Sequence, residues 1–362
     1  MKNKNLLAGF VVSLWTGVAL ICLPVMSVLA TEDVLERPAM PSSRLDERVL
    51  LALSQAGPRL VAVGEHGLVL LSDDHGKSWR QAQVPVSVTL TNVYFVNDRQ
   101  GWAVGHSGVV LHSSDAGETW LKQLDGKAAA QSILAAARTL MPADPGRVAE
   151  AERLVAEGPD KPFLDVRFHD GEHGLVVGAY GLAFSTDDGG RHWTPRLNIP
   201  NPRGLHLYRI ALAGERVYIA GEQGALFYSR DGGENFSVLP SPYEGSYFGL
   251  LAAPDGLLLV FGLRGNLFRS DDAGQSWQAI DSGGSVALAD GLYAGDGSLV
   301  LVDQAGRVLR SRDRGRTFQS RLIASAGPVA SVVESGDGSL LLGGLHGITR
   351  VPLASNSAGG AQ

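Results

Sequence analysis

The twenty residues from 101 to 120, GWAVGHSGVVLHSSDAGETW, contain the pattern that decides the fold. They end in the box Ser-x-Asp-x-Gly-x-x-Trp, which occurs six times along the chain, once with Thr for Ser and twice with Phe for Trp. The box aspartates are Asp74, Asp115, Asp188, Asp231, Asp272 and Asp313, spaced 41, 73, 43, 41 and 41 residues apart. A period of this length, with short strands and glycine turns, is typical of a β-propeller.

A Gly-x-x-Gly turn precedes each box and indicates the number of blades. The turns lie at 64–67, 105–108, 178–181, 221–224, 262–265, 303–306 and 344–347, with Asp303 replacing the first glycine of the sixth. Seven turns and six boxes predict an all-β, seven-bladed propeller of four-stranded antiparallel blades, whose last blade is incomplete in sequence. One period before the first box, Arg37–Ser42 stand where an outer strand belongs. We expect them to complete the blade built from Pro328 to Pro352, because an outermost strand tolerates proline.

Each box is expected on the turn between the third and fourth strands of its blade. In the second repeat, strands are predicted at 89–96, 101–105, 108–113 and 120–124. The box aspartate can accept hydrogen bonds from the turn, its glycine permits a positive φ, and its aromatic residue packs between blades. Metal binding or catalysis by the aspartates is the alternative. We favour the structural role, since a catalytic residue is seldom copied into every repeat.

The composition argues against several classes of site. A net charge of −6 and a pI of about 5.9 do not suit a nucleic-acid binder, which carries a basic surface. Cys22 is the only cysteine and the histidines lack zinc-ligand spacing, so we expect no cofactor and no metal. His66, His106 and His346 occupy equivalent turns and would bind a metal if they met around the channel mouth. Exposed turn histidines are the alternative that we favour.

The first thirty residues resemble an export signal. Two lysines precede an apolar run from Leu6 to Met26, and the sequence VLA at 28–30 is similar to a signal-peptidase site. We expect cleavage after Ala30, with an uncleaved membrane anchor as the alternative, because about 20 apolar residues can span a bilayer. The expected divisions are a signal peptide at 1–30, a propeller at 31–353 and a disordered tail at 354–362. We therefore expect an exported monomer, in a periplasm or a lumen.

One spacing between boxes exceeds the period by 32 residues and predicts an insertion at 125–160, between blades two and three. Lys127–Met141 is rich in Ala and Leu, which favours a helix. Asp144 and Pro145 indicate the start of a second helix, which continues over Arg147–Glu157. Because the insertion follows a fourth strand, we expect this helical hairpin on the face of the Gly-x-x-Gly turns, opposite the boxes. A tolerated surface insertion without function is the alternative.

The face of the Gly-x-x-Gly turns gathers the polar and aromatic side chains that differ from blade to blade. Tyr, Arg and His are frequent in recognition hot spots, so we expect this face to bind a partner, with ordinary solvated turn residues as the alternative. The candidate contact residues are Glu65, His66, His106, Tyr180, Arg196, Arg203, His206, Tyr208, Glu222, Gln223, Tyr243, Tyr247, Arg264 and His346.

The repeat at Gly101–Trp120 resembles that of the photosystem II stability/assembly factor propellers, within the wider group of bacterial neuraminidase (Asp-box) repeats. The resemblance covers Leu50–Pro352. It implies a non-enzymatic lumenal or periplasmic factor that binds and helps to assemble or stabilise a membrane protein complex. It also implies a binding face with an arginine cluster, for which Arg196, Arg203, Arg209 and Arg264 are the candidates.

A glycoside hydrolase of the sialidase type is the competing class. Such an enzyme needs an arginine triad, a Tyr nucleophile with a Glu partner and an acidic residue. Tyr243 and Glu244 are neighbours, but no Arg-Ile-Pro motif precedes the repeats, and Arg37-Pro38 comes nearest to it. We therefore expect no catalytic residues, and keep the hydrolase as the alternative.

Overall fold

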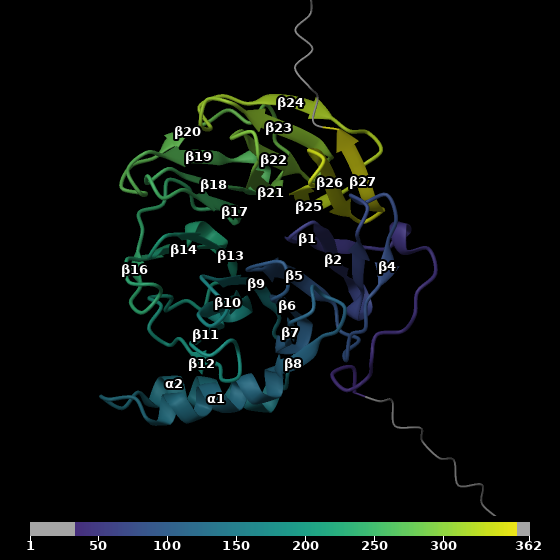
Figure 1. Ribbon diagram of the computed structural model, residues 1–362. Coiled ribbons are helices and arrows are strands. Elements are labelled where there is room, and N and C mark those ends of the chain that lie inside the picture. Colours follow the sequence, from purple (N-terminus) through teal and green to yellow (C-terminus); the bar gives the residue numbers. More distant parts are fainter. Residues whose placement is uncertain (1–32, 353–362) are drawn as a thin grey trace, which may run out of the picture. The chain divides into compact units, whose positions relative to one another are not determined.

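The computed structural model describes residues 33–352, which form a ring of seven antiparallel sheets around a central channel (Figure 1). Blade one contains β1 (Leu50–Ala56), β2 (Arg59–Gly64), β3 (Val69–Ser72) and β4 (Arg80–Gln81). Blade two contains β5 (Leu90–Phe95), β6 (Gly101–Gly105), β7 (Val110–Ser113) and β8 (Leu121–Leu124). Blade three contains β9 (Phe163–Phe168), β10 (Gly174–Gly178), β11 (Ala183–Thr186) and β12 (Thr194–Pro195). Blade four contains β13 (Leu207–Ala213), β14 (Arg216–Gly221), β15 (Leu226–Ser229) and β16 (Ser237–Val238).

The remaining three blades complete the ring. Blade five contains β17 (Tyr247–Ala252), β18 (Leu258–Gly262), β19 (Leu267–Ser270) and β20 (Gln278–Ala279). Blade six contains β21 (Leu288–Tyr293), β22 (Leu299–Asp303), β23 (Arg307–Ser311) and β24 (Gln319–Leu322). Blade seven contains only β25 (Val329–Glu334), β26 (Ser339–Gly344) and β27 (Gly347–Pro352). The prediction of seven antiparallel blades is confirmed, with four strands in six of them.

The hydrophobic core is distributed between neighbouring blades rather than collected in one centre. The second strand of a blade is sandwiched between its neighbours, and every residue of β6, β10, β18, β22 and β26 is buried. Between blades two and three, Trp102 stacks on Phe168 with ring centroids 3.4 Å apart. A strand that is buried on both sides has a continuous run of apolar residues. The second strands therefore show no alternation of apolar and polar residues.

The six boxes lie on the turns from the third to the fourth strand and are saturated with internal hydrogen bonds. In the second box, Ser113 Oγ donates to Asp115 Oδ1 at 2.8 Å, and Thr119 donates through its N–H at 3.0 Å and its hydroxyl at 2.6 Å. The position before the aromatic residue contributes to each box, a role that the sequence pattern did not indicate. Its occupants are Ser78, Thr119, His192, Asn235, Ser276 and Thr317.

The predicted closure of the ring is wrong in one respect. Arg37–Ser42 do not pair with blade seven, whose sheet has only three strands among the described residues. They run instead beside the outer edge of blade one, where Ala39 N donates to Val84 O at 3.0 Å. Two prolines in this stretch lack the N–H groups that a continuous strand needs. Blade seven meets blade one through the inner strands, where Leu53 N donates to Ser331 Oγ at 3.1 Å.

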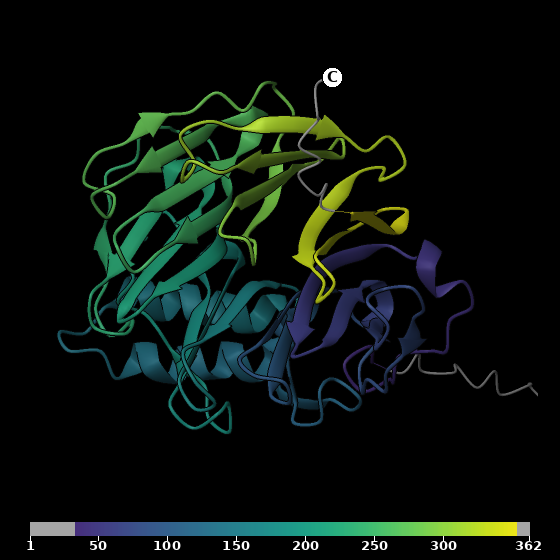
Figure 2. The same cartoon turned by 45° about the horizontal axis from the view of Figure 1, so that its top comes forward.

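The insertion forms two antiparallel helices at the rim of the ring, α1 (Gly126–Arg138) and α2 (Pro145–Glu157) (Figure 2). Asp125 caps α1 by accepting from the N–H groups of Lys127 and Ala128, and Asp144 caps α2. Gly126 lies directly against the Gly-x-x-Gly turn of blade two, so that a side chain there would meet Ser107 O at 2.8 Å. The predicted helical hairpin, and its position on the face of these turns, are confirmed.

No helix among residues 33–352 is long and apolar enough to cross a membrane. The expected signal peptide or anchor at 1–30 and the expected tail at 354–362 lie outside the described residues.

Candidate functional site

The two faces of the ring carry different turns. The box face carries the six boxes. The turn face carries the Gly-x-x-Gly turns. Five of them form short 3-10 helices, η2 (Glu65–Gly67), η3 (His106–Gly108), η4 (Ala179–Gly181), η5 (Glu222–Gly224) and η6 (Leu263–Gly265). The middle residue of each has a positive φ, between 50° and 58°. Left-handed backbone at non-glycine residues costs about 1 kcal/mol or more, and it is retained here with five different side chains. The turns thus present variable side chains on a constant backbone.

Four aromatic rings form a row across the turn face, from the hairpin side toward the channel. Tyr180 meets His206 edge to face at 4.8 Å between centroids, and His206 lies 6.2 Å from Tyr208. Tyr208 in turn meets Phe248 at 5.6 Å. This aromatic row joins blades three, four and five. Three of its members were predicted, and Phe248, which follows the buried Tyr247, was missed.

His206 is held in place by hydrogen bonds from both sides. Its Nδ1 accepts from the backbone N–H of Tyr180 at 2.8 Å, which leaves the ring proton of a neutral imidazole on Nε2. The backbone N–H of His206 donates to Glu222 Oε2 at 3.0 Å. Because these bonds fix the imidazole, the row presents a preformed surface and loses little side-chain freedom on binding.

At its outer end the aromatic row borders a groove between the helical hairpin and blade three. This hairpin groove has a volume of about 700 Å³. Its floor is apolar, with Ile133, Leu154 and Ile199, and Tyr180 stands at its edge with 60% of its surface exposed. Most of the charges along its rim are paired, for example Lys161 with Glu157 at 2.9 Å. The groove is therefore wide and mixed in character, without a free charge cluster.

At its inner end the aromatic row reaches the channel mouth. This hollow of about 470 Å³ is mainly apolar and is lined by Leu51, Phe248, Ala289, Pro328, Ala330 and Leu345 among others. Leu345, from the last Gly-x-x-Gly turn, is 51% exposed. Exposed leucine at the rim of an apolar hollow is typical of a surface that receives another apolar group.

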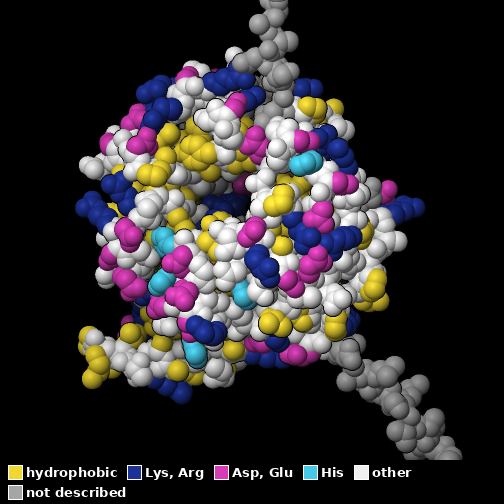
Figure 3. Space-filling model, viewed as in Figure 1, with side chains coloured by type: hydrophobic (Ala, Val, Ile, Leu, Met, Phe, Trp, Pro, Cys, Tyr) yellow, Lys and Arg dark blue, Asp and Glu magenta, His cyan; other side chains and the backbone are white. Residues whose placement is uncertain are grey.

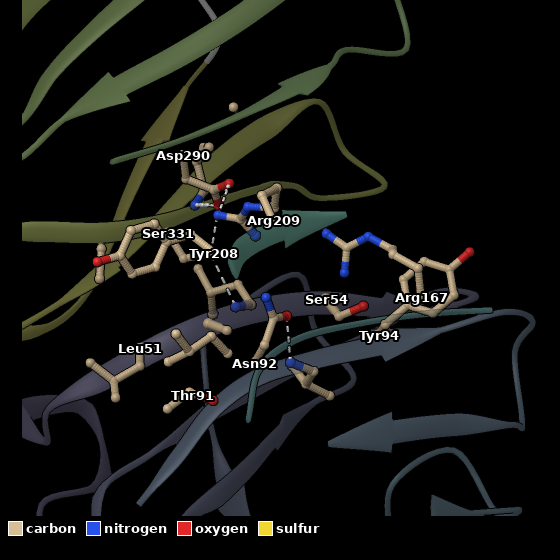
Figure 4. A pocket seen from close by; sticks show the side chains of 17 residues that line it. Leu51, Ser54, Thr91, Asn92, Tyr94, Arg167, Tyr208, Arg209, Asp290 and Ser331 are labelled. Carbon is tan, nitrogen blue, oxygen red and sulfur yellow. Dashed lines mark hydrogen bonds and ion pairs between the residues drawn. The ribbon is translucent and has the colours of Figure 1, made fainter. Parts of the chain in front are cut away.

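Below the mouth, the channel is crossed by a ring of equivalent residues, one from each inner strand. Every inner strand has a bulge or register shift near its start. The residue that follows it is Ala52, Asn92, Asp165, Arg209, Gly249, Asp290 or Ser331, in order of the blades. These seven residues, the channel belt, occupy equivalent positions but differ in chemistry. Figure 4 shows four of them, Asn92, Arg209, Asp290 and Ser331.

The channel belt holds two acidic groups that are engaged by N–H donors. Asp165 is fully buried and accepts from Asn92 Nδ2 at 2.8 Å, from Arg167 Nη1 at 2.8 Å and from the backbone N–H of Ile210 at 2.7 Å. Asp290 accepts from Arg209 Nη2 at 3.1 Å, and also from the Ser331 hydroxyl. Several of these bonds cross from one blade to the next, so the belt joins the blades. The sequence repeats did not point to it.

The predicted contact residues divide into groups. Tyr180, His206 and Tyr208 come together in the aromatic row, and Glu222 accepts from the backbone N–H of His206. Arg203 lies nearby and donates to Gln223 at 2.9 Å. The turn residues Glu65, His66, His106 and His346 are exposed but belong to blades one, two and seven, and Arg264 is exposed on blade five. No group of three or more metal-ligating side chains occurs in the part of the chain that the structure describes.

Three predicted contact residues have other surroundings than expected. Tyr247 is fully buried, its hydroxyl is 2.9 Å from Ser241 Oγ, and burial raises the pKa of Tyr247 to about 12. Tyr243 packs on Phe268. Arg196 forms a bidentate pair with Glu234 of the next blade. These side chains pack or join blades, and the placement of Tyr247 on the exposed face is wrong because its ring fills the space between sheets.

The arginines that the family resemblance implied do not form one cluster. Arg196 is paired at the rim, Arg209 lies inside the channel, and Arg264 is exposed on blade five. Figure 3 shows cationic and anionic side chains interspersed over one face of the ring, with hydrophobic side chains gathered on one side of the central opening. Shape and aromatic contact therefore offer more for recognition than a field of one sign.

Comparisons of the sequence with known proteins match it to one family. The family model described as "Photosynthesis system II assembly factor YCF48" matches residues 49–137 and 149–319. The photosystem II assembly lipoprotein Ycf48 of Synechococcus sp. (strain CC9902) is 43% identical over 77 residues, which are 21% of this chain and 23% of that protein. Its counterpart from strain CC9605 is 40% identical over 53 residues, 14% of this chain and 16% of that protein. The chain thus matches less than a quarter of the length of each.

Solved structures share the fold. YCF48 bound to a D1 peptide superposes with a TM-score of 0.63 at 16% identity, covering 88% of this chain and 100% of that one. A streptogramin B lyase superposes with a TM-score of 0.66 at 11% identity, covering 89% of this chain and 100% of the lyase. At such identities the likeness establishes the propeller architecture alone.

Proposed function

Because this chain belongs to the family of Ycf48-type photosystem II assembly factors, we propose that it is an exported, non-enzymatic propeller that binds a segment of a membrane protein during assembly of a membrane complex. The binding surface in this proposal is the turn face, from the hairpin groove along the aromatic row to the channel mouth. The aromatic row is the observation that carries it. A row of preformed rings between a groove with an apolar floor and an apolar channel mouth suits an extended polypeptide, whose side chains can fill the two hollows while its backbone follows the rings.

Relatives support the class of partner. Two proteins of this family are named as photosystem II assembly lipoproteins, and a solved YCF48 is bound to a D1 peptide. We propose a membrane protein or membrane-associated complex as the partner of this chain, and a periplasmic or lumenal location. The apolar stretch Leu6–Met26 agrees with export.

The non-enzymatic role is supported by the way the carboxylates are used. Glycoside hydrolysis needs one carboxyl group to give a proton and a second to attack or to activate water. In the boxes, internal donors occupy the aspartate oxygens, as in Asp115, and in the channel Asp165 and Asp290 are engaged in the same way. Turnover of any member of an aryl glycoside panel would overturn this part of the proposal.

The test is crosslinking in native membranes followed by affinity capture of the tagged protein. We expect one integral-membrane complex to be recovered with the unmodified chain. Tyr180→Ala and Tyr208→Ala should each reduce that recovery several-fold, because each removes a ring of the aromatic row. Tyr293→Ala is the matched control, since Tyr293 is 42% exposed and ends the inner strand β21 at the opposite face. Equal recovery with all three variants would contradict the proposed surface.

A further inference from the structure

The end of the helical hairpin carries an apolar loop that nothing in the described part of the chain covers. This loop, the hairpin tip, consists of residues 140–143 with the sequence LMPA, and it projects beyond the ring between α1 and α2 (Figure 1). Met141 is 92% exposed, the highest value among the large hydrophobic side chains of residues 33–352, and Pro142 and Ala143 are exposed as well. Figure 3 shows hydrophobic side chains gathered at this end of the hairpin.

The hairpin tip is a surface separate from those described above. The two helices pack on each other through a cluster built on Leu134, Ala137 and Ala151, and the tip takes no part in it. The tip does not line the hairpin groove either. The family model leaves out residues 138–148, which lie between its two matched ranges. The tip is therefore an addition of this chain to the pattern that the family shares.

We propose that the hairpin tip inserts into the surface of a lipid bilayer and holds the hairpin edge of the propeller against the membrane. Leu140, Met141 and Pro142 make the contact, and their side chains enter the boundary between the lipid headgroups and the acyl chains. This inference goes beyond the proposed function, because it concerns a second surface and states how the propeller is oriented on the membrane.

The chain enters the described structure at the base of the same hairpin. Asp33, the first described residue, pairs with Lys127 in the first turn of α1, and Asp33 Oδ2 lies 2.5 Å from Lys127 Nζ. Six residues lie between Met26, the end of the apolar run, and Asp33, so this stretch reaches at most about 25 Å. While the apolar run lies in a membrane, during export or as a retained anchor, the base of the hairpin stays within this distance of the bilayer.

Helix α1 leads along the rim from that base to the tip. Its 13 residues span about 20 Å, so the base and the tip are two separate points on one edge of the molecule. Contacts at two points fix the tilt of the ring against the membrane, whereas a single flexible tether leaves the tilt free. Because the hairpin groove lies between this edge and blade three, the same contact brings the proposed binding surface next to the membrane that holds the partner.

A bilayer suits the tip better than a second protein does. A stable protein interface buries about 800 Å² on each partner, and a loop of this size offers only a part of that area. The neighbouring charges do not extend the surface, because Arg138 pairs with Glu152 at 3.0 Å and Arg147 pairs with Asp144 at 3.5 Å. A bilayer needs no complementary shape and accepts a small apolar group.

The charge of the hairpin predicts which lipids the tip accepts. Residues 126–157 contain four cationic and four anionic side chains, so their net charge is zero. Attraction to anionic lipids comes from an excess of Lys and Arg, which the hairpin lacks. The contact should therefore be hydrophobic in origin and equal on neutral and on anionic vesicles.

The test follows the tip with a fluorescent probe. Met141→Cys and Leu322→Cys are each made in the full chain together with Cys22→Ser, purified after export, and labelled with NBD, whose emission shifts to shorter wavelength in an apolar medium. Leu322 is the matched control, since it is 58% exposed and lies on β24, on the opposite side of the ring from the hairpin (Figure 1). With phosphatidylcholine vesicles we expect a blue shift of the probe at position 141 alone. Nitroxide groups on the acyl chains should quench this probe about twofold more than the probe at position 322.

Substitutions at the tip separate insertion from folding. With the probe moved to Ala143→Cys, Met141→Asp should reduce the blue shift by more than about half, because a carboxylate is costly to bring to the acyl chains. Met141→Leu should keep the shift, and Leu322→Asp is the matched control that should not change it. Because Met141 is exposed, none of these variants should alter the temperature of thermal unfolding.

Equal responses of the probes at positions 141 and 322, whether both shift or neither does, would overturn the inference. A shift that occurs only when the vesicles contain phosphatidylserine would show an electrostatic contact and would overturn it as well. The proposed function is tested separately, because capture of the partner from detergent-solubilised membranes should not change in Met141→Asp. Loss of capture in that variant would place the tip in the partner interface and overturn its assignment to lipid.

Discussion

The two faces of this propeller use the same repeat in opposite ways. On the box face, six turns of nearly identical sequence form hydrogen bonds within themselves, as Asp115 does with Ser113 and Thr119. On the turn face, one turn backbone is shared by five blades and carries a different side chain in each of them, and rings and apolar surfaces remain uncovered. The comparison shows that a residue repeated from blade to blade has a structural role. A residue that departs from the repeat is where binding should be sought.

The largest effect is expected from the packing that supports both faces. Trp102→Ala removes a fully buried ring stacked on Phe168, and should lower the free energy of unfolding by about 3–5 kcal/mol. Urea denaturation followed by intrinsic fluorescence measures this, with Trp102→Phe as the milder control. A loss below about 1 kcal/mol would mean that the interface between blades two and three is not tightly packed.

A smaller loss is expected on the box face. Asp115→Ala leaves Thr119 and Ser113 without their acceptor in a partly exposed turn, and should cost about 1–2 kcal/mol of unfolding free energy. Binding at the turn face should not change. If capture of the partner fell along with stability at a temperature where the variant is folded, the separation of roles between the faces would be refuted.

The ionisation of Asp115 in the same box makes the free energy of unfolding depend on pH. Burial raises the pKa of Asp115, but hydrogen bonds from Thr119 and Ser113 lower it more, so its pKa in the folded protein lies below 3.8. The ionised group therefore stabilises the fold above pH 3.8, and this contribution is lost as the pH falls through the folded pKa. The difference in unfolding free energy between the wild type and Asp115→Ala should shrink below pH 4. A difference that is constant from pH 7 to pH 2.5 would contradict the hydrogen bonds from Ser113 and Thr119 to the ionised Asp115.

The smallest effect on stability is expected on the turn face. Tyr180→Ala removes an exposed ring and should change the free energy of unfolding by less than about 0.5 kcal/mol, while it weakens capture of the partner. Chemical denaturation measures the first quantity and crosslinking the second. Substantial destabilisation would make Tyr180 a packing residue and would remove the contrast with the boxes.

Much of the fold followed from the sequence because its signals are local. The box and turn spacing gave the blade count, and Asp144 with Pro145 located the start of α2. The outer strand expected at Arg37–Ser42 was wrong, because a counted period says nothing about whether two prolines can pair with a strand. Pairing across the ends of the chain is a long-range contact, which local spacing does not determine.

The candidate site was only partly predictable. Tyr180, His206 and Tyr208 could be chosen because they depart from the repeat near a turn. Phe248 and Tyr247 are adjacent in sequence, and only the alternation of the strand decides which ring faces out. The channel belt was missed because its residues share no type. They are equivalent by register at a bulge, which has no sequence signature here.

The hydrogen bond from Leu53 to Ser331 joins the last blade to the first at the same inner-strand level at which Val332 donates to Asp290 of blade six. The contact that closes the ring, between blades seven and one, is thus of the same kind as the contacts between its other blades. An open stack of repeats can fray from either end. A ring that is closed by a contact of the same kind as its others has no end at which unfolding can begin. Loss of any one blade then exposes both of its neighbours, so the ring should melt in a single cooperative transition although it is assembled from seven small sheets.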